Sequence, residues 1–504
     1  AASMRERWNW VFPVVFSPAN GQTLYAGSQH LWRSEDDGQS WEKISPDLTR
    51  ADPETLGETG GAIRLDQDGP EVYGTIYTIA PSPIDEDLLW VGSDDGLVHL
   101  SRNGGKSWEN VTPKDLPPHS RISLIDASAH APGTAYLVAK RYEMGDRAPY
   151  VYLTKNFGKN WEKRVRGLAE DDFAHSIEED PELPGLVYLG TERGVSVSFD
   201  EGVSWRSLSL NLPSTPVMGV EVRGDELAIA THGRSFYVLE GLPTLRQLAN
   251  DGAPSGATLY PPNRAVLSAV TAQLNFFLPE AVDDARGVIL DNEGNTVSQL
   301  FMRPQLGAGA HTVEWLLRYN GAVMFPGMIL EAVPPFVGPE VIPGEYTARI
   351  SAGGAVMEQA ITVVQDPRKA TLSLEDLTAQ RDLALEVRDA ISAANGTVLK
   401  IRKLRSEIEE DKVSAEALLT ALSAVENRLY QTRNQSPKDK IAYPIQLNDR
   451  LSLLYNYLIF GHGAPTQPQR DVFSELQGEL AEALAAFQEV MDGEYRQYQA
   501  QLTP

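Results

Sequence analysis

The sequence predicts a mainly β protein in which β-propeller blades are followed by an Ig-like β-sandwich and a C-terminal α-helical bundle. Two observations predict this fold class. A short turn motif recurs four times in the first half, and the hydrophobic spacing changes from alternating to helical after residue 370. The 504 residues exceed what one ordinary hydrophobic core needs, and 41 Gly and 33 Pro are typical of a chain with many turns. We expect three domains, at 1–245, 246–370 and 371–504.

The composition narrows the class of partner. The formal net charge of −25 disfavours contact with the phosphate backbones of DNA or RNA. The chain has no cysteine, which excludes disulfides and thiolate sites and fits a bacterial extracytoplasmic protein, periplasmic or secreted. No apolar run approaches the ~20 residues that span a bilayer, so we expect no integral membrane protein. Residue 1 is Ala rather than Met, which fits a processed chain or a part of a longer one.

The recurring motif reads Ser/Thr-x-Asp/Asn-x-Gly-x-x-Trp. Its polar turn residues are Asp36, Asn103, Asn156 and Asp200, and its aromatic residues are Trp41, Trp108, Trp161 and Trp205. Asp or Asn folds its side chain back onto backbone N–H groups, Gly supplies a positive φ, and Trp is expected to bury a large ring between sheets. We therefore interpret all of these residues as structural. The motif is identified as the Asp-box, or BNR repeat.

A longer unit surrounds each motif. It reads as strand, Pro turn, strand, Gly turn, strand, motif and strand, with short strands rich in β-branched and aromatic residues. Four antiparallel strands of this kind make one propeller blade. A fifth unit, Val217 to Leu239, keeps the strands and lacks the motif. We therefore expect about five blades in residues 1–245, and either a small ring that closes by itself or further blades supplied elsewhere.

Several segments carry a family resemblance. They are Tyr73–Ile76, Gly92–Gly96, Gly190–Gly194, Ala230–Phe236, Phe325–Met328 and Pro343–Thr347. With the four motifs, they resemble the large bacterial BNR-repeat proteins of the sortilin-like (VPS10-type) propeller class. The resemblance implies secreted proteins about twice this length, with this chain as the C-terminal half and further blades in an N-terminal half. Such proteins are often labelled glycosyl hydrolases, and fold analogy does not establish that activity.

The second half changes character twice. Alternating strands between residues 246 and 370 predict the Ig-like sandwich, and the Pro- and Gly-rich loop Gly321–Pro343 is expected to pack against the propeller. From Ser373, a predicted N-cap, the spacing is helical. Further helices are expected over 413–433, 446–460 and 469–501. These helices are expected to form a hairpin or small bundle, and a role in oligomer formation stays open.

Blade geometry selects the candidate site residues. The loops that join the second and third strands lie on the face opposite the motif, together with the entries to the inner strands. The candidate ligand-binding residues on these loops are Asp94, Asp95, Glu192, Arg193, His232 and Arg234, and those at the entries are Glu71, Tyr73, Arg121, Asp171 and Asp172. A ring of carboxylates, guanidinium groups and one imidazole suits a polar ligand or a peptide. The alternative interpretation is a set of tight turns with local ion pairs.

Catalytic signatures are weak. A glycosidase needs two carboxylates about 5–10 Å apart. Asp94 with Glu192 or Asp171 is the least unfavourable pairing, and nothing in the sequence fixes its distance. The sequence has no Gly-x-Ser-x-Gly, no P-loop, no His-Glu-x-x-His and no sialidase-type Arg-Ile-Pro segment. The run Asp66–Gly69 is interpreted as a turn rather than a calcium loop. We expect no cofactor and no metal.

Two functions follow from these patterns. The first is a non-enzymatic extracytoplasmic β-propeller scaffold that binds a protein or peptide partner. The alternative is a secreted glycoside hydrolase that acts on polysaccharide with paired carboxylates on the propeller face opposite the motif.

Overall fold

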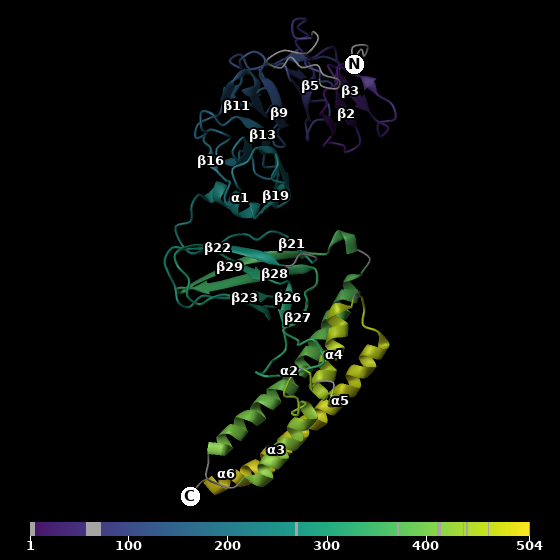
Figure 1. The fold of residues 1–504 in the computed structure, drawn as a ribbon, viewed down its shortest axis with the longest axis vertical. Coiled ribbons are helices and arrows are strands. Elements are labelled where there is room, and N and C mark those ends of the chain that lie inside the picture. The colour runs from purple at the N-terminus through teal and green to yellow at the C-terminus, as the bar shows by residue number, and fades with distance from the viewer. Residues whose placement is uncertain are drawn as a thin grey trace. The chain divides into compact units, whose positions relative to one another are not determined.

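A computed structural model describes residues 6–56, 72–267, 271–369, 372–410, 415–436, 438–439, 442–461 and 463–502. Glu71 and the run Asp66–Gly69 lie outside these residues. The chain divides into two compact units, Ala1–Gly252 and Ala253–Pro504. The first unit consists mainly of small antiparallel sheets, and the second contains further sheets followed by the predicted helical region (Figure 1).

The described part of the first unit contains five antiparallel sheets, numbered here in chain order. Sheet 1 holds β1 (Val14–Phe16), β2 (Leu24–Gly27), β3 (Leu31–Ser34) and β4 (Glu42–Lys43), and sheet 2 holds β5 (Ile76–Pro81), β6 (Leu89–Ser93), β7 (Val98–Ser101) and β8 (Glu109–Asn110). Sheet 3 holds β9 (Arg121–Ala127), β10 (Ala135–Arg141), β11 (Asp146–Thr154) and β12 (Glu162–Lys163), and sheet 4 holds β13 (Ala174–Glu179), β14 (Val187–Thr191), β15 (Val195–Ser198) and β16 (Arg206–Ser207). Sheet 5 has three strands, β17 (Val217–Arg223), β18 (Glu226–Thr231) and β19 (Phe236–Glu240).

Consecutive sheets pack against each other. Strand β2 packs against β5, β5 against β9, β9 and β10 against β13, and β13 against β17. Alternating residues of each strand enter the layers between sheets, so that Trp90 and Leu137 share one apolar cluster and Tyr188 and Val220 share another. Up-and-down sheets that pack in chain order have the arrangement of β-propeller blades.

The four motif turns share one hydrogen-bond pattern. The Ser or Thr hydroxyl accepts the backbone N–H of the motif glycine at 2.8–3.0 Å, and the Asp or Asn Oδ1 accepts the N–H four residues on at 2.8–2.9 Å. Gly38 and its three counterparts have positive φ angles, which only glycine adopts without strain. The structural interpretation of Asp36, Asn103, Asn156 and Asp200 rests on these local bonds.

The motif tryptophans link each sheet to the one before it. The indole N–H of Trp108 donates to the carbonyl of Ile44 at 3.1 Å, that of Trp161 to Val111 at 2.7 Å, and that of Trp205 to Arg164 at 2.9 Å. Each acceptor directly follows the two-residue fourth strand of the preceding sheet. Trp205 is 4% exposed and Trp108 and Trp161 are half-buried.

The expectation of a buried ring is wrong for Trp41. Its ring is 39% exposed, and its indole donates to Gly38 of its own turn at 3.0 Å. The physical reason is that sheet 1 has no preceding sheet within the described residues to cover this ring.

Sheet 5 ends in a helix instead of a fourth strand. After β19 the chain enters α1 (Leu242–Asp251), in agreement with the absence of the motif from this unit. The buried Arg246 of α1 donates to both carboxylate oxygens of Asp180, at 3.0 Å each, and ties the helix to sheet 4. Leu242 packs in the apolar layer between sheets 4 and 5.

The second unit begins with two main sheets. One has the order β20 (Thr258–Leu259), β22 (Ala272–Leu278), β25 (Gly309–Trp315), and the other has the order β21 (Ala265–Val266), β29 (Ala355–Val364), β28 (Gly344–Ala352), β23 (Arg286–Leu290), β24 (Thr296–Leu300). Strands β26 (Arg318–Asn320) and β27 (Val337–Glu340) form a separate pair. Phe276, Ile289 and Ile350 lie in one apolar cluster that both main sheets share. The Ig-like assignment stays a prediction.

The predicted C-terminal helical region is confirmed. Its helices are α2 (Leu374–Glu410), α3 (Glu416–Leu429), α4 (Leu447–Phe460), α5 (Gln467–Val490), a π-helical turn (Met491–Tyr495) and α6 (Arg496–Leu502). Ser373 acts as the predicted N-cap, because its hydroxyl accepts the N–H of Asp376 at 3.1 Å. Val387, Ile391 and Val398 follow the helical period and are fully buried. No described helix is long and apolar enough to cross a membrane.

The loop 321–343, called the strap here, packs against these helices. The buried carboxylate of Asp449 accepts the N–H groups of Glu331 and Ala332 at 2.8 and 2.9 Å. Phe325 of the strap meets the ring of Tyr430 edge-on, at 5.0 Å between centroids. The expected contact of this loop with the propeller stays a prediction. The helices provide polar groups for the part of the strap that precedes β27, whose backbone N–H groups have no partner in a regular strand.

Candidate functional site

The turns between the second and third strands carry the predicted ligand-binding residues. Asp94 and Asp95 lie between β6 and β7, Glu192 and Arg193 between β14 and β15, and His232 and Arg234 between β18 and β19. The inner strands β5, β9, β13 and β17 begin next to these turns, which brings Arg121 and Tyr73 to the same end of the sheets.

Asp94 is held as a structural anchor. One carboxylate oxygen accepts the N–H groups of Gly74 and Thr75 at 3.0 and 2.8 Å, and the other accepts the hydroxyl of Thr75 at 2.9 Å. The residue is 2% exposed, and this burial raises the pKa of its carboxyl to about 7. A carboxyl in this position fixes the entry to β5 and is closed to a large substrate.

Asp95 anchors a different segment. Its carboxylate accepts the hydroxyl of Ser93 at 2.6 Å and the N–H of Arg50 at 2.8 Å, while the Arg50 side chain donates to the Asp95 carbonyl at 2.7 Å. The pair therefore joins the turn of sheet 2 to the chain that follows sheet 1. Burial raises the pKa of Asp95 as well.

Glu192 belongs to a chain of polar side chains across sheets 3 and 4. Its Oε2 lies 2.9 Å from Nε2 of His175 on β13, and Nδ1 of that histidine lies 3.3 Å from Nζ of Lys140 on β10. Arg147 of β11 lies 3.9 Å from the other Glu192 oxygen. Lys140 and His175 are buried, whereas Glu192 and Arg147 reach solvent. We call these four residues the relay cluster.

The hydrogen bonds of the relay cluster assign the state of the imidazole. A lysine ammonium donates only, so Nδ1 of His175 accepts from Lys140. Nε2 then carries the proton and donates it to Glu192. Burial lowers the pKa of His175, and the nearby charges of Lys140 and His232 lower it further. A neutral imidazole fits both contacts.

Burial also lowers the pKa of Lys140, to about 8, with a further lowering by the charge of Arg121. The cluster therefore holds a lysine whose charge changes just above neutral pH. A buried amine with a lowered pKa next to a histidine is a feature of functional sites, and structural networks show it too.

Aromatic rings and one further arginine, Arg121, border the relay cluster. Tyr142, in the 3₁₀ turn Tyr142–Met144, stacks on Phe173 with 5.1 Å between ring centroids. The guanidinium of Arg147 lies over the same Phe173 ring at 5.2 Å. Arg121 lies 5.1 Å from the centre of the Tyr77 ring and pairs with Glu143 at 2.8 Å. These contacts hold the guanidinium groups in place while leaving N–H donors for a ligand.

The remaining predicted residues lie around this cluster. Arg193 pairs with Asp171, and Asp172 accepts the hydroxyl of Thr191 at 3.0 Å. His232 contributes to the lowered pKa of His175, whereas Arg234 is exposed and its backbone N–H donates to Thr231. The candidate carboxylates Asp94, Asp171 and Glu192 therefore have separate partners on separate turns.

Sequence reasoning missed Lys140 and His175. Lys140 ends an apolar run, Val138-Ala139-Lys140, whereas the strand of His175 also carries Ser176, Glu178 and Glu179. A charged residue at a buried strand position is the signal that could have found them, because such a residue needs a partner. The partner itself comes from another sheet and is invisible in the sequence.

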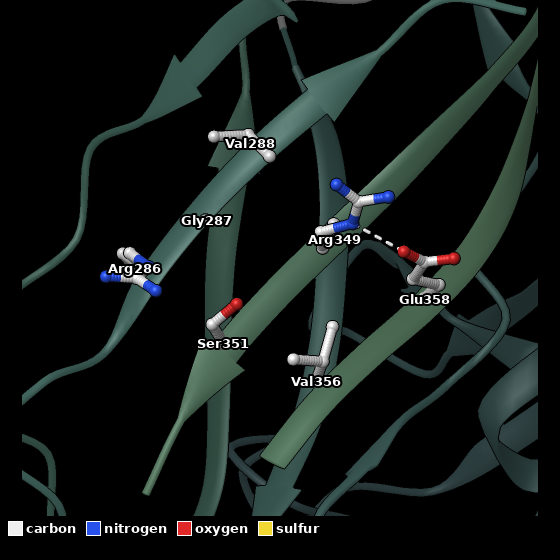
Figure 2. Close-up of a pocket in the computed structure, with 7 residues that line it drawn as sticks. All are labelled: Arg286, Gly287, Val288, Arg349, Ser351, Val356 and Glu358. Atoms are coloured by element: carbon white, nitrogen blue, oxygen red, sulfur yellow. Dashed lines mark hydrogen bonds and ion pairs between the residues drawn. The ribbon is translucent and has the colours of Figure 1, made fainter. Parts of the chain in front are cut away.

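A shallow hollow of about 480 Å³ lies on the second unit, on the surface of the five-stranded sheet. Figure 2 shows Arg286 and Val288 on β23, Arg349 and Ser351 on β28, and Glu358 on β29, with an ion pair between Arg349 and Glu358. None of the sequence-predicted site residues lines it. Within the described residues, no group of three His, Asp or Glu side chains is placed to hold a metal ion.

Comparison with known proteins gives no family. No protein-family model matches the sequence, and no curated protein matches it. Solved structures do match. The GH74 xyloglucanase from Xanthomonas campestris has a TM-score of 0.35 and 12% identity, over 71% of this chain and 55% of that one. The GH74 enzyme of Niastella koreensis has a TM-score of 0.35 and 11% identity, over 70% and 54%.

YCF48 from Cyanidioschyzon merolae has a TM-score of 0.32 and 13% identity, over 62% of this chain and 97% of that one. This chain spans about half the length of the GH74 structures that it matches. All of these TM-scores lie below 0.5, so the proposals below depend on the geometry of this chain.

Proposed function

We propose that this chain is a non-enzymatic, extracytoplasmic binding module of β-propeller type, which holds a segment of a protein partner at the relay cluster. The observation that carries the proposal is the contact chain Lys140–His175–Glu192, which joins two sheets and ends at the solvent-accessible Glu192 and Arg147. Binding sites of propellers are built from such turns because the sheets hold them rigidly.

The charges of the site favour a ligand with a carboxylate group. Arg121 and Arg147 supply cationic donors beside the aromatic pair Tyr142 and Phe173, and the buried Lys140 adds a positive charge behind them. An acidic side chain or a free C-terminus would pair with these donors, and the rings would pack against an adjacent apolar side chain. We therefore propose an extended peptide with an acidic residue or its own C-terminus as the bound segment.

The state of the candidate acids supports binding rather than hydrolysis. A glycosidase needs two accessible carboxyl groups on either side of a scissile bond. Asp94 is buried and bonded to Gly74 and Thr75, Asp171 pairs with Arg193, and Glu192 accepts from His175. Each of these groups has a structural partner in place of a free, matched acid and base.

An array of ten-residue peptides with free C-terminal carboxylates would test the proposal. Peptides that end in Asp or Glu are expected to bind more tightly than their amidated counterparts. Arg147→Ala is expected to weaken binding about tenfold or more, the effect of a lost charge-assisted hydrogen bond. Lys140→Met removes a buried positive charge and is expected to weaken binding less, because Lys140 has no direct contact with the ligand. Arg349→Ala, which removes an exposed arginine of the second unit, is the matched control and should bind normally.

Two outcomes would contradict the proposed peptide binding. Equal binding of a peptide that ends in Asp or Glu and of its amidated Asn or Gln counterpart, which has no carboxylate at that end, would overturn the proposal. So would hydrolysis of a polysaccharide that is lost in both Asp94→Asn and Glu192→Gln, because that result assigns the carboxylates to catalysis.

A further inference from the structure

Sheets 1 and 5 are the two outer sheets of the first unit, and within the described residues each has one face that no other sheet covers. In sheets 2 to 5, one residue of each inner strand faces the preceding sheet and is buried. These residues are Ile79, Ile125, Ile177 and Val220, with exposures of 6, 4, 0 and 6%. The register places Val14 of β1 at the same position, because it pairs with Ala26 just before Gly27, as Ile79 pairs with Val91 just before Gly92. Val14 is 50% exposed.

Trp41 marks the same uncovered side of sheet 1. In the next three sheets the motif indole donates to a carbonyl that follows the fourth strand of the preceding sheet, at 2.7–3.1 Å. Trp41 has the turn contact to Gly38, and its ring is exposed. Phe16, on the same strand as Val14, is 58% exposed. This exposed face of sheet 1 is apolar and carries an indole N–H. The next three sheets have the same features on the face that is buried against the preceding sheet.

A second kind of contact recurs on the faces that the sheets turn toward the next sheet in the chain. On β9 the carboxylate of Asp126 accepts the N–H of Glu179 in sheet 4 at 2.7 Å. On β13 the carboxylate of Glu178 accepts the N–H of Val222 in sheet 5 at 2.8 Å. The two acids occupy equivalent positions, since Asp126 pairs with Tyr136 and Glu178 with Tyr188 in their sheets.

Glu221 is the third member of this series. It occupies the same position on β17, where it pairs with Ala228, and Ala228 in turn pairs with Val238. The side chain of Glu221 is 52% exposed and forms an ion pair with Arg223 of its own strand. Val238 lies on the same face and is 57% exposed, and Phe236, two residues before it on β19, is 81% exposed. Sheet 5 thus offers an acceptor and an apolar surface to a further sheet.

A second copy of this chain does not supply the missing contacts. Head-to-tail association would place sheet 5 of one copy before sheet 1 of the other. Sheet 5 continues from β19 into α1 and has no fourth strand, so it offers the Trp41 indole no carbonyl equivalent to those that accept from Trp108, Trp161 and Trp205. The sheet that fits sheet 1 has four strands.

We propose that both outer faces are interfaces for further four-stranded sheets of the same repeat, carried by a polypeptide segment other than residues 1–504. One such sheet covers Val14 and Phe16 and accepts the indole N–H of Trp41 behind its fourth strand. Another covers Phe236 and Val238 and donates an inner-strand N–H to Glu221. This proposal is independent of the ligand proposed above.

Site-specific photocrosslinking in the protein as isolated from its own organism tests the proposal. The photoreactive amino acid p-benzoylphenylalanine is placed at Val14 or Phe236, and in a control at Tyr457, which is 71% exposed on α4. Mass spectrometry of the crosslinked peptides is expected to identify, from both test positions, segments with the Ser/Thr-x-Asp/Asn-x-Gly-x-x-Trp motif that lie outside residues 1–504.

Two results would overturn the proposal. The first is a crosslink from Val14 to β17–β19 of a second copy. The second is a crosslink yield at Val14 and Phe236 no higher than at Tyr457. Val14→Asp gives a further check, because an exposed valine tolerates this change within its own sheet. If one segment covers both faces, Val14→Asp is expected to reduce the crosslink yield from position 236 in the intact assembly several-fold. An undiminished yield would contradict that arrangement.

Discussion

The carboxylate of Glu178 on β13 accepts a hydrogen bond of 2.8 Å from the backbone N–H of Val222 on β17. This bond joins the inner strands of sheets 4 and 5. Glu178 is also crowded by the acids Glu221 and Asp126. Burial, with the repulsion of these neighbours, raises the pKa of Glu178 to about 9.

This relationship predicts a pH dependence of stability. Since the pKa of Glu178 is higher in the folded state than in the unfolded chain, the folded state loses stability as the pH rises from about 5 to 9. Glu178→Gln removes this titration and keeps an oxygen for Val222. The variant should match the wild type near pH 5 and exceed its free energy of unfolding near pH 9 by at least about 1 kcal/mol, the value of one pKa unit. Urea unfolding at several pH values measures the difference. The exposed Glu170→Gln is the control, and parallel curves for wild type and Glu178→Gln would contradict the assignment.

Asp94 is predicted to act on stability. Asp94→Ala leaves the N–H groups of Gly74 and Thr75 buried without an acceptor, which is expected to lower the free energy of unfolding by about 2–4 kcal/mol. Denaturant unfolding measures the loss, and the exposed Glu86→Ala should change it little. A fully stable Asp94→Ala variant would show that the buried carboxylate does not hold the entry to β5.

The motif tryptophans allow a matched comparison. Trp205→Phe removes a buried indole and its 2.9 Å bond to the Arg164 carbonyl, so we expect a loss of about 1–3 kcal/mol in the free energy of unfolding. Trp41→Phe in the 504-residue chain replaces an indole that is already exposed. We expect the free energy of unfolding to change by no more than about 0.5 kcal/mol. Thermal denaturation of both variants gives the comparison. Equal losses would mean that the contact between sheets adds nothing to the role of the ring in its own turn.

The titration of Lys140 predicts the pH dependence of ligand binding. Because burial lowers the pKa of this amine to about 8, it is charged below that pH and neutral above it. The affinity for a carboxylate peptide should therefore fall as the pH rises through about 8. Calorimetric titrations between about pH 6.5 and 9.5 measure the affinity, and Lys140→Met should remove this step. A step that survives in Lys140→Met belongs to another group.

Asp449 is predicted to fasten the strap. Asp449→Ala removes the acceptor for the N–H groups of Glu331 and Ala332 and is expected to expose residues 321–343 to proteases. Limited proteolysis followed by mass spectrometry locates the first cuts. The exposed Asp471→Ala on α5 is the control. Cuts that begin in the helices instead would show that the strap depends on its apolar contacts.

Much of the fold could be predicted because its signals are local. Ser34, Asp36 and Gly38 bond within one turn, so eight residues in a row are enough to reveal each motif. The helical region followed from the spacing of Val387, Ile391 and Val398, and its start from Ser373. The sequence-based sandwich topology, the domain limits and the sortilin-like resemblance stay predictions.

The candidate site could be predicted only in part. The turns that hold Glu192, Arg193 and Asp171 were identified from blade geometry. The roles were not, because burial decides them. Asp94 and Asp95 are as polar as Glu192 in sequence, yet the packing of neighbouring segments encloses the first two and leaves the third at the surface.

The sequence by itself therefore determined the repeat, the turn chemistry and the change from strands to helices, since each depends on residues a few positions apart. Only the tertiary structure decided which side chains meet between sheets. Lys140, His175 and Glu192 come from β10, β13 and the turn after β14, and their contacts arise when two sheets pack. The same holds for Trp41 and Glu221, whose exposure depends on whether a further sheet lies against them. Contact between distant segments and the removal of water set the partners of these side chains and the pKa values of Lys140 and His175, and neither is a property of a short stretch of sequence.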